Sequence, residues 1–209
     1  AASEYPNVRM ILNPEIVEVC NSRNEKVNLL LLPYRDRRMY DGSNIREQTA
    51  GFNSHIEALV KEAKGELPLI AIGHNFFFEG SYNDYGGSEV MAAPGSFNGC
   101  DIAVMGHLHQ FRVLQKRAPV CIYSGSMEKS NFGDAGVDKY FIDYDFFDKK
   151  LKFCKSEVRN LLDKAIDLSD CDFSNIAESL KSSFDEEDFT DKIVRVKVTA
   201  DEKVVQALD

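Results

Sequence analysis

The sequence lacks the features of membrane and secreted proteins. Its 209 residues contain no uninterrupted apolar run near the roughly 18 to 20 residues that a membrane-spanning helix needs. The N-terminus does not show a basic stretch followed by an apolar one, as a secretory signal peptide does. We therefore expect a soluble chain with a cytoplasmic location.

Cysteine is scarce and follows no pattern. The five cysteines are an odd number, are widely spaced and include no Cys-x-x-Cys pair. Neither a disulfide framework nor a thiolate zinc site fits this distribution. We expect ordinary free thiols in a reducing, cytosolic environment.

Internal repeats and low-complexity tracts are also missing. The composition is 44% hydrophobic, 28% charged and 11% aromatic, which is typical of a globular protein able to bury a core. Collagen, coiled coil and full disorder are excluded.

The formal charge of −9 comes mostly from one stretch. Residues 165–191 hold nine acidic side chains and one lysine, a net charge of −8, so the other residues together have about −1. Such a block is typical of a solvated acidic surface. The whole-chain charge therefore does not exclude nucleic acid, whose phosphates bind Lys and Arg.

The period of the apolar residues alternates between strand-like and helix-like, which predicts an α/β or α+β fold. Strands are predicted at seven places: 26–32, 69–72, 101–105, 120–123, 139–144, 151–158 and 192–199. A helix is predicted to begin after Asn44, which has capping-box spacing to Glu47, and to end near Gly65. Shorter helices are predicted near 158–166, 174–183 and 201–208.

Three of the four histidines stand directly behind predicted buried strands. His74 follows the second predicted strand, and His107 and His109 follow the third, in each case after a glycine. Strand ends are held rigidly at the open edge of a sheet, where α/β proteins build their sites. Each histidine alone also suits a core or loop position, but together they predict a site for manganese, iron or zinc. His55, on the predicted helix, is expected to have a structural role.

Five segments, in this order, resemble the later motifs of the calcineurin-like metallophosphoesterases: 69–74, 102–109, 123–126, 131–136 and 138–141. The Tyr-x-Gly-Ser segment, the Phe-Gly-x-x-Gly stretch and the Lys-Tyr-Phe strand are similar more narrowly to the SbcD family. That family comprises the nuclease subunits of SbcCD-type double-strand-break processing complexes. Gly-His-x-His is moderately specific alone, whereas the ordered set is much more specific.

The resemblance implies a fold and a domain organisation. Residues 1–146 would form the later half of a four-layer α/β/β/α metallophosphoesterase sandwich. Residues 147–209 would form a connector and the start of a small α+β capping domain.

The resemblance also implies a metal-dependent DNA nuclease. Two divalent metal ions, Mn²⁺ first and Mg²⁺ second, would be bound, with His74 and His107 ligating one ion and His109 the other. The activity implied is exonucleolytic on duplex ends and endonucleolytic on single strands or hairpins, in DNA repair, recombination and replication. The implied partners are DNA, an SbcC-type SMC-like ATPase and a second copy of the chain as a homodimer.

The chain departs from the family in one respect. The motifs Asp-x-His, Gly-Asp-x-x-Asp and Gly-Asn-His-Asp/Glu, which supply carboxylate ligands and a transition-state histidine, do not occur in it. We therefore expect a piece that lacks the N-terminal motifs, ends inside its capping domain, binds metal weakly and is inactive by itself.

Candidate DNA contacts are less specific. A basic cluster could bind phosphate, or could simply be solvated; it comprises Arg35, Arg37, Arg38 and Arg46, of which Arg37 and Arg38 are the preferred candidates. Ser124 and Ser126 could donate to a phosphate oxygen, or could serve a turn. The aromatic loop over 76–85 could follow a DNA strand or pack internally.

Two other functions remain open. One is a metallophosphoesterase of the same fold that acts on nucleotides or phosphomonoesters. The other is a non-catalytic interaction fragment whose acidic block at 165–191 binds a basic partner.

Overall fold

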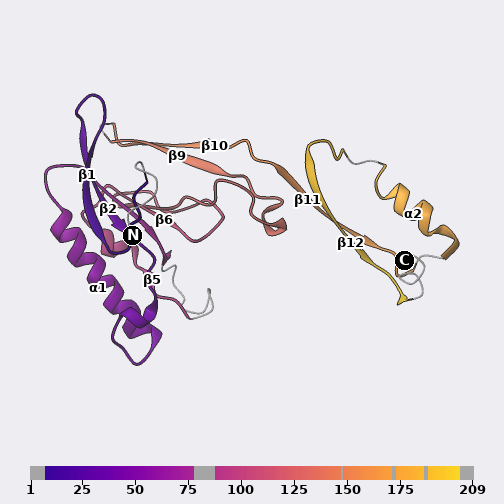
Figure 1. Ribbon diagram of the computed structural model, residues 1–209, viewed down its shortest axis with the longest axis horizontal. Helices are drawn as coiled ribbons and strands as arrows, with labels where there is room; N and C mark the ends of the chain where they lie inside the picture. Colours follow the sequence, from indigo (N-terminus) through magenta and orange to yellow (C-terminus); the bar gives the residue numbers. More distant parts are fainter. Residues whose placement is uncertain (1–7, 78–87, 147, 171–172, 186–187, 203–209) are drawn as a thin grey trace. The chain divides into compact units, whose positions relative to one another are not determined.

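The computed structural model describes residues 8–77, 88–146, 148–170, 173–185 and 188–202, and they form two compact units. The first unit comprises residues 1–126 and 140–154, and the second comprises residues 127–139 and 155–209. The described secondary structure is mixed α and β, as the sequence predicts (Figure 1). Within the described ranges, no helix is both long and apolar enough to cross a membrane.

The first unit is built on a six-stranded sheet with the order β1-β2-β3-β6-β8-β7. Its four inner strands run parallel: β2 (Lys26–Leu32), β3 (Leu69–His74), β6 (Ile102–Gly106) and β8 (Val120–Tyr123). The apolar runs of all four are those expected of buried parallel strands, and these four predictions are confirmed. Parallel pairing places all four carboxyl ends at one edge of the sheet.

The outer strands are antiparallel to their neighbours. These are β1 (Glu15–Cys20), which pairs with β2, and β7 (Arg112–Gln115), which pairs with β8. Neither was predicted, because both are short and their apolar residues show no clear alternation. A separate hairpin of β9 (Tyr140–Asp145) and β10 (Lys150–Lys155) and the short pair β4 (Phe76–Phe77) and β5 (Met91–Ala92) complete the strands of this region.

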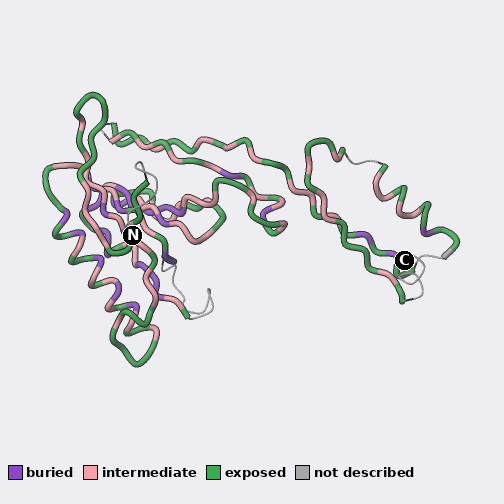
Figure 2. Tube along the Cα trace, in the orientation of Figure 1, coloured by how far each residue is buried: buried purple, intermediate pink, exposed green. Residues whose placement is uncertain are grey.

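Helix α1 (Ile45–Ala63) covers one face of the sheet and begins as predicted. The side chain of its N-cap residue Asn44 accepts hydrogen bonds from the backbone of Arg46 and Glu47. The apolar stripe of the helix packs on alternate residues of the inner strands, and Figure 2 shows the buried residues gathered there. The members of this core include Leu30, Phe52, Ile56, Val60, Ala71, Ala103 and Tyr123.

The opposite face of the sheet is less covered. Leu29 and Leu31 of β2 pair in register with Ile70 and Ile72 of β3. These side chains point away from α1, and Ile72 is 42% exposed. The same face continues at Val104 of β6, the register partner of Ile72. An apolar strip therefore crosses three strands on the side that α1 does not cover.

The second unit contains one strand–helix–strand element. Strands β11 (Asn160–Asp167) and β12 (Lys192–Thr199) pair in parallel, and η4 (Phe173–Asn175) and α2 (Ile176–Ser182) lie between them in the chain. A small core of Ile166, Leu168 and Ile176 joins strand and helix. The predictions of a helix at 174–183 and a strand at 192–199 are confirmed. The predicted helix at 201–208 lies almost entirely outside the described residues.

The helix predicted near 158–166 is wrong, because this stretch is β11. Its apolar residues satisfy a helical spacing as well as an alternating one, so periodicity alone cannot separate the two. Register with the strongly alternating β12 decides the conformation: Leu162 pairs with Val194, and Ile166 pairs with Val198. The pairing partner lies about 30 residues away, beyond any local signal.

A buried ion pair holds the segment 127–139 of the second unit together internally. Lys139 is 1% exposed, and its ammonium lies 3.4 Å from Asp134 in η3 (Phe132–Asp134). The Asp134 carboxylate also accepts a hydrogen bond from the backbone of Ser130. Two other 3₁₀ turns, η1 (Arg37–Met39) and η2 (Pro94–Phe97), belong to the first unit. The predicted domain boundary after residue 146 stays a prediction about the intact protein.

Tyr123→Phe is expected to destabilise the first unit by about 1–3 kcal/mol. Tyr123 is fully buried, and its hydroxyl accepts a hydrogen bond from the backbone N–H of Phe77. Removing the oxygen leaves that buried N–H without this acceptor. Urea unfolding measures the effect, and Tyr140→Phe, at a half-buried tyrosine of the same unit, is the control. Equal stability of the two variants would contradict the prediction.

Candidate functional site

The candidate site lies at the carboxyl edge of the parallel strands. His74 is the last residue of β3, and His107 directly follows β6, the next strand in the sheet. Tyr34 follows the end of β2 on the other side of β3. Residues that the chain separates by up to 73 positions therefore meet at one edge, as expected for α/β sites.

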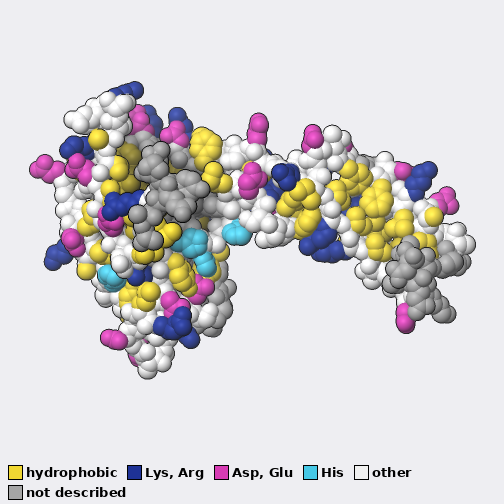
Figure 3. Space-filling model, viewed as in Figure 1, with side chains coloured by type: hydrophobic (Ala, Val, Ile, Leu, Met, Phe, Trp, Pro, Cys, Tyr) yellow, Lys and Arg dark blue, Asp and Glu magenta, His cyan; other side chains and the backbone are white. Residues whose placement is uncertain are grey.

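The two imidazoles are direct neighbours. The ring centroids of His74 and His107 are 5.3 Å apart, and the rings are almost perpendicular, with an interplanar angle of 89°. The Phe76 ring contacts His107 edge-on, with the ring centroids 4.1 Å apart. The Tyr34 ring is stacked on His107, with the centroids 6.5 Å apart. In Figure 3, histidine surfaces of this unit stand beside hydrophobic side chains. The His107 ring is thus held by aromatic packing.

The backbone of His107 has a conformation that non-glycine residues rarely adopt. Its φ is +100°, outside the regions favoured by L-amino acids. Such a conformation costs on the order of 1–3 kcal/mol and persists only where the surroundings impose it, often at functional sites. The turn it creates at the end of β6 places the imidazole beside His74.

Glu89 is a member of the site that the sequence did not reveal. One of its carboxylate oxygens lies 3.6 Å from Nε2 of His107 and accepts a hydrogen bond of 3.3 Å from the Tyr34 hydroxyl. Glu89 lies between β4 and β5, where no motif marks it in the sequence. The sequence signal that could have pointed to it is an acidic residue in the segment that follows His74.

The electrostatics of the site favour a neutral His74. Desolvation by partial burial lowers its pKa below the ordinary value, and the neighbouring His107 lowers it further. Glu89 acts in the opposite direction and raises it. Because neutral imidazole is the metal-binding form, competition by protons is reduced.

Gly106 makes room for His74. A Cβ at Gly106 would lie 2.6 Å from Nδ1 of His74, closer than atoms can approach. A Cβ at Gly73 would lie 2.6 Å from Sδ of Met105. The glycines that precede both histidines are therefore explained by close packing between β3 and β6.

The segment with Ser124 and Ser126 folds against the segment with His109. The backbone N–H of Ser126 donates to the carbonyl of His109 at 3.1 Å, and its hydroxyl contacts the same carbonyl at 3.5 Å. The Ser124 hydroxyl donates to the carbonyl of Gly125 at 3.3 Å. Gly125 has a φ of +75°, and a Cβ there would lie 2.9 Å from the backbone nitrogen of Phe111. These contacts fit the turn role for both serines and bring the turn beside His109.

The two predicted arginines lie in η1, after the end of β2. Arg38 forms a two-point ion pair with Asp36, at 2.8 and 3.0 Å, which lowers the pKa of Asp36 to about 2. Its charge is thus largely neutralised, whereas Arg37 is exposed. Of the predicted aromatic loop, Phe76 and Phe77 are buried in the core, and residues 78–87 lie outside the described part.

The side chains at this edge suit two ligands of a divalent ion, but they do not form a complete coordination sphere. His74 and His107 supply adjacent imidazoles, and Glu89 supplies a carboxylate beside one of them. Among the described residues, no group of three or more His, Cys, Asp or Glu side chains is arranged to hold a metal ion. The predicted assignment of His74, His107 and His109 as metal ligands stays a prediction.

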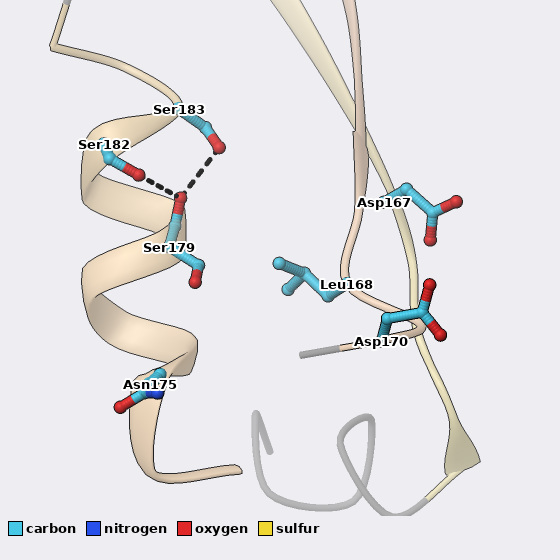
Figure 4. Close-up of a pocket in the computed structure, with 7 residues that line it drawn as sticks. All are labelled: Asp167, Leu168, Asp170, Asn175, Ser179, Ser182 and Ser183. Carbon is cyan, nitrogen blue, oxygen red and sulfur yellow. Dashed lines mark hydrogen bonds between the residues drawn. The ribbon is translucent and has the colours of Figure 1, made fainter. Parts of the chain in front are cut away.

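The acidic block surrounds a polar hollow in the second unit. Its volume is about 690 Å³, and it lies between α2 and the turn after β11 (Figure 4). The hydroxyls of Ser182 and Ser183 donate to the carbonyl of Ser179, and Leu168 points toward the helix. Asp167 is occupied by the backbone and hydroxyl of Ser169. These local hydrogen bonds fit a solvated acidic surface.

The chain matches no model of a known protein family. The resemblance to calcineurin-like metallophosphoesterases therefore depends on the order of its motifs, and its functional consequences are proposals.

His107→Gly is expected to be more stable than His107→Ala by about 1 kcal/mol, because only glycine adopts a positive φ without strain. Chemical denaturation of the two variants measures the difference. Both lose the same imidazole, so each serves as the control of the other. A more stable alanine variant would show that φ at this position is not strained.

Gly106→Ala is expected to displace the His74 ring, because the added Cβ overlaps Nδ1 of His74. The imidazole signals of His74 in a nuclear magnetic resonance spectrum should shift or broaden. Gly65→Ala is the matched control, since a Cβ at Gly65 would meet no atom within 4 Å. Unchanged His74 signals in the Gly106 variant would contradict the packing described.

Proposed function

We propose that this chain belongs to the nuclease subunit of an SbcCD-type complex, a metal-dependent hydrolase of DNA phosphodiesters. The observation that supports this most is the meeting of His74 and His107 at the carboxyl edge of adjacent parallel strands, with Glu89 beside them. In the resemblance, the same two histidines are ligands of one metal ion. Local geometry and motif order therefore favour the same function.

The proposal includes the four-layer sandwich. The apolar strip formed by Leu29, Leu31, Ile70, Ile72 and Val104 is left partly exposed by α1 and suits a second sheet packed against it. In the proposed protein, the missing motifs and their carboxylates come with that second layer. This chain alone would then supply only the later ligands and would be inactive.

Each residue of the edge has a proposed task. His74 and His107 hold one divalent ion and His109 holds the other, with Mn²⁺ preferred and Mg²⁺ second. Bound ions of this kind hold the scissile phosphate, lower the pKa of an attacking water and neutralise developing charge. Phe76 and Tyr34 fix the orientation of the His107 ring, and partial burial lowers the pKa of His74, which favours its neutral form.

The proposed partners follow the same resemblance. DNA is the substrate, an SbcC-type SMC-like ATPase controls access to it, and the nuclease subunit is a homodimer. Arg37 is the better of the two predicted arginines for a DNA phosphate, because Arg38 is paired with Asp36. Ser124 and Ser126 are proposed to contribute through the turn that they form beside His109.

The intact protein is expected to cleave linear duplex and hairpin DNA in the presence of Mn²⁺, and chelation of the metal is expected to abolish cleavage. His74→Ala and His107→Ala should each lower the rate at least about a hundredfold, as is typical when a metal ligand is removed. Cleavage of end-labelled DNA measures the rates.

His55→Ala is the matched control, because His55 lies on α1 and its ring bonds to the Tyr40 hydroxyl. Faster hydrolysis of p-nitrophenyl phosphate than of DNA would favour a phosphomonoesterase instead. Absence of both activities, together with a metal content that His74→Ala and His107→Ala leave unchanged, would favour a non-catalytic interaction fragment and overturn the proposal.

A further inference from the structure

Arg35 has a guanidinium that the described protein leaves largely without acceptors. Its Nε is buried and has no hydrogen-bond partner. Its Nη1 contacts only the sulfur of Met39, at 3.5 Å, and sulfur is a weak acceptor. No carboxylate among the described residues forms an ion pair with it. The rest of the guanidinium is less buried, but a buried N–H donor without an acceptor is unfavourable and calls for an explanation.

Among the described arginines, only Arg35 has a buried guanidinium nitrogen without a hydrogen-bond partner. Arg38 is paired at two points with Asp36, and Arg195 is paired at two points with Asp163. The carboxylate nearest in sequence, that of Asp36, pairs with Arg38. The guanidinium of Arg35, three residues earlier in the chain, forms no ion pair with any carboxylate of the described ranges.

The backbone of Arg35 is held firmly beside the candidate site. Its N–H donates to Oδ1 of Asn75, and its carbonyl accepts from Nδ2 of Asn75, each at 3.1 Å. Asn75 is 2% exposed and directly follows His74. On the other side, Tyr34 stacks on His107. One buried amide therefore ties the loop after β2 to the end of β3.

We propose that Arg35 binds a phosphate oxygen of the DNA backbone at this edge. A guanidinium presents several N–H donors in a planar fork that matches phosphate geometry, so a bound phosphate would satisfy donors that the protein leaves free. The clamp by Asn75 positions the residue before the ligand arrives, which reduces the entropy cost of binding. The choice of DNA as the phosphate source rests on the proposed function.

A phosphate-binding role and a structural role of Arg35 predict different effects of the substitution Arg35→Met. If Arg35 is a phosphate ligand, Arg35→Met should weaken binding, and it should also keep or raise the thermal denaturation midpoint, because an unsatisfied buried donor is removed. If Arg35 is structural, the same substitution should lower the midpoint.

The test uses the intact protein in the presence of a metal chelator, so that no cleavage occurs. A fluorescent 30-base-pair duplex is titrated at several salt concentrations, and anisotropy gives the dissociation constant. Arg35→Met is expected to weaken binding about tenfold and to reduce the slope of log K against log salt by about one. Inorganic phosphate should compete with the duplex for wild-type protein and less for the variant.

Arg23→Met is the matched control for charge. Arg23 is exposed in the turn between β1 and β2, at the opposite end of β2 from Arg35. Its removal should leave the dissociation constant unchanged. Binding by Arg35→Met that equals wild type, or a lowered denaturation midpoint together with weak binding, would overturn the inference.

The outcome is separable from that of the proposed function. Wild-type protein that cleaves DNA while Arg35→Met binds normally would overturn only the role of Arg35. Wild-type protein that cleaves no DNA but binds phosphate through Arg35 would overturn the nuclease and leave a phosphate site in place.

Discussion

Parallel pairing of four buried strands is the constraint on which the candidate site depends. The strands β2, β3, β6 and β8 share one direction, so every segment that leaves a strand end emerges at the same edge. Hydrogen bonds of the ladders and the apolar contacts with α1 hold these ends rigidly. Short polar segments beyond the ends then need little further structure to bring imidazole, phenol and carboxylate groups together.

The edge is organised by close approach as much as by polar contacts. Gly106 allows His74 to lie directly against β6, and the positive φ of His107 turns its ring back toward His74. Two buried side chains support this edge. Asn75 ties the loop after β2 to β3, and the Tyr123 hydroxyl accepts a hydrogen bond from the backbone of Phe77. Buried groups with fixed partners thus support exposed groups that are free to meet a ligand.

Strong local patterns made much of the fold predictable. The inner strands, α1 with its cap at Asn44, α2 and β12 all have clear periodicity or capping residues, and the structure confirms them. The stretch 158–166 was predicted as a helix and is a strand, because only its register with β12 distinguishes the two. The edge strands β1 and β7 were missed because a single neighbour defines them and their sequences are weakly patterned.

Local sequence patterns show which residues stand at strand ends, since apolar runs followed by Gly-His mark both the strand and the residues that leave it. These patterns predicted His74 and His107 as members of a site. Which groups meet depends on the tertiary structure. It brings Glu89 and Tyr34 to His107 and pairs Arg38 with Asp36, and among the described residues no carboxylate pairs with the Arg35 guanidinium. The spacing of apolar residues is a local property of the chain. Contacts between loops depend instead on strand order and on the few backbone angles at which each loop leaves the sheet.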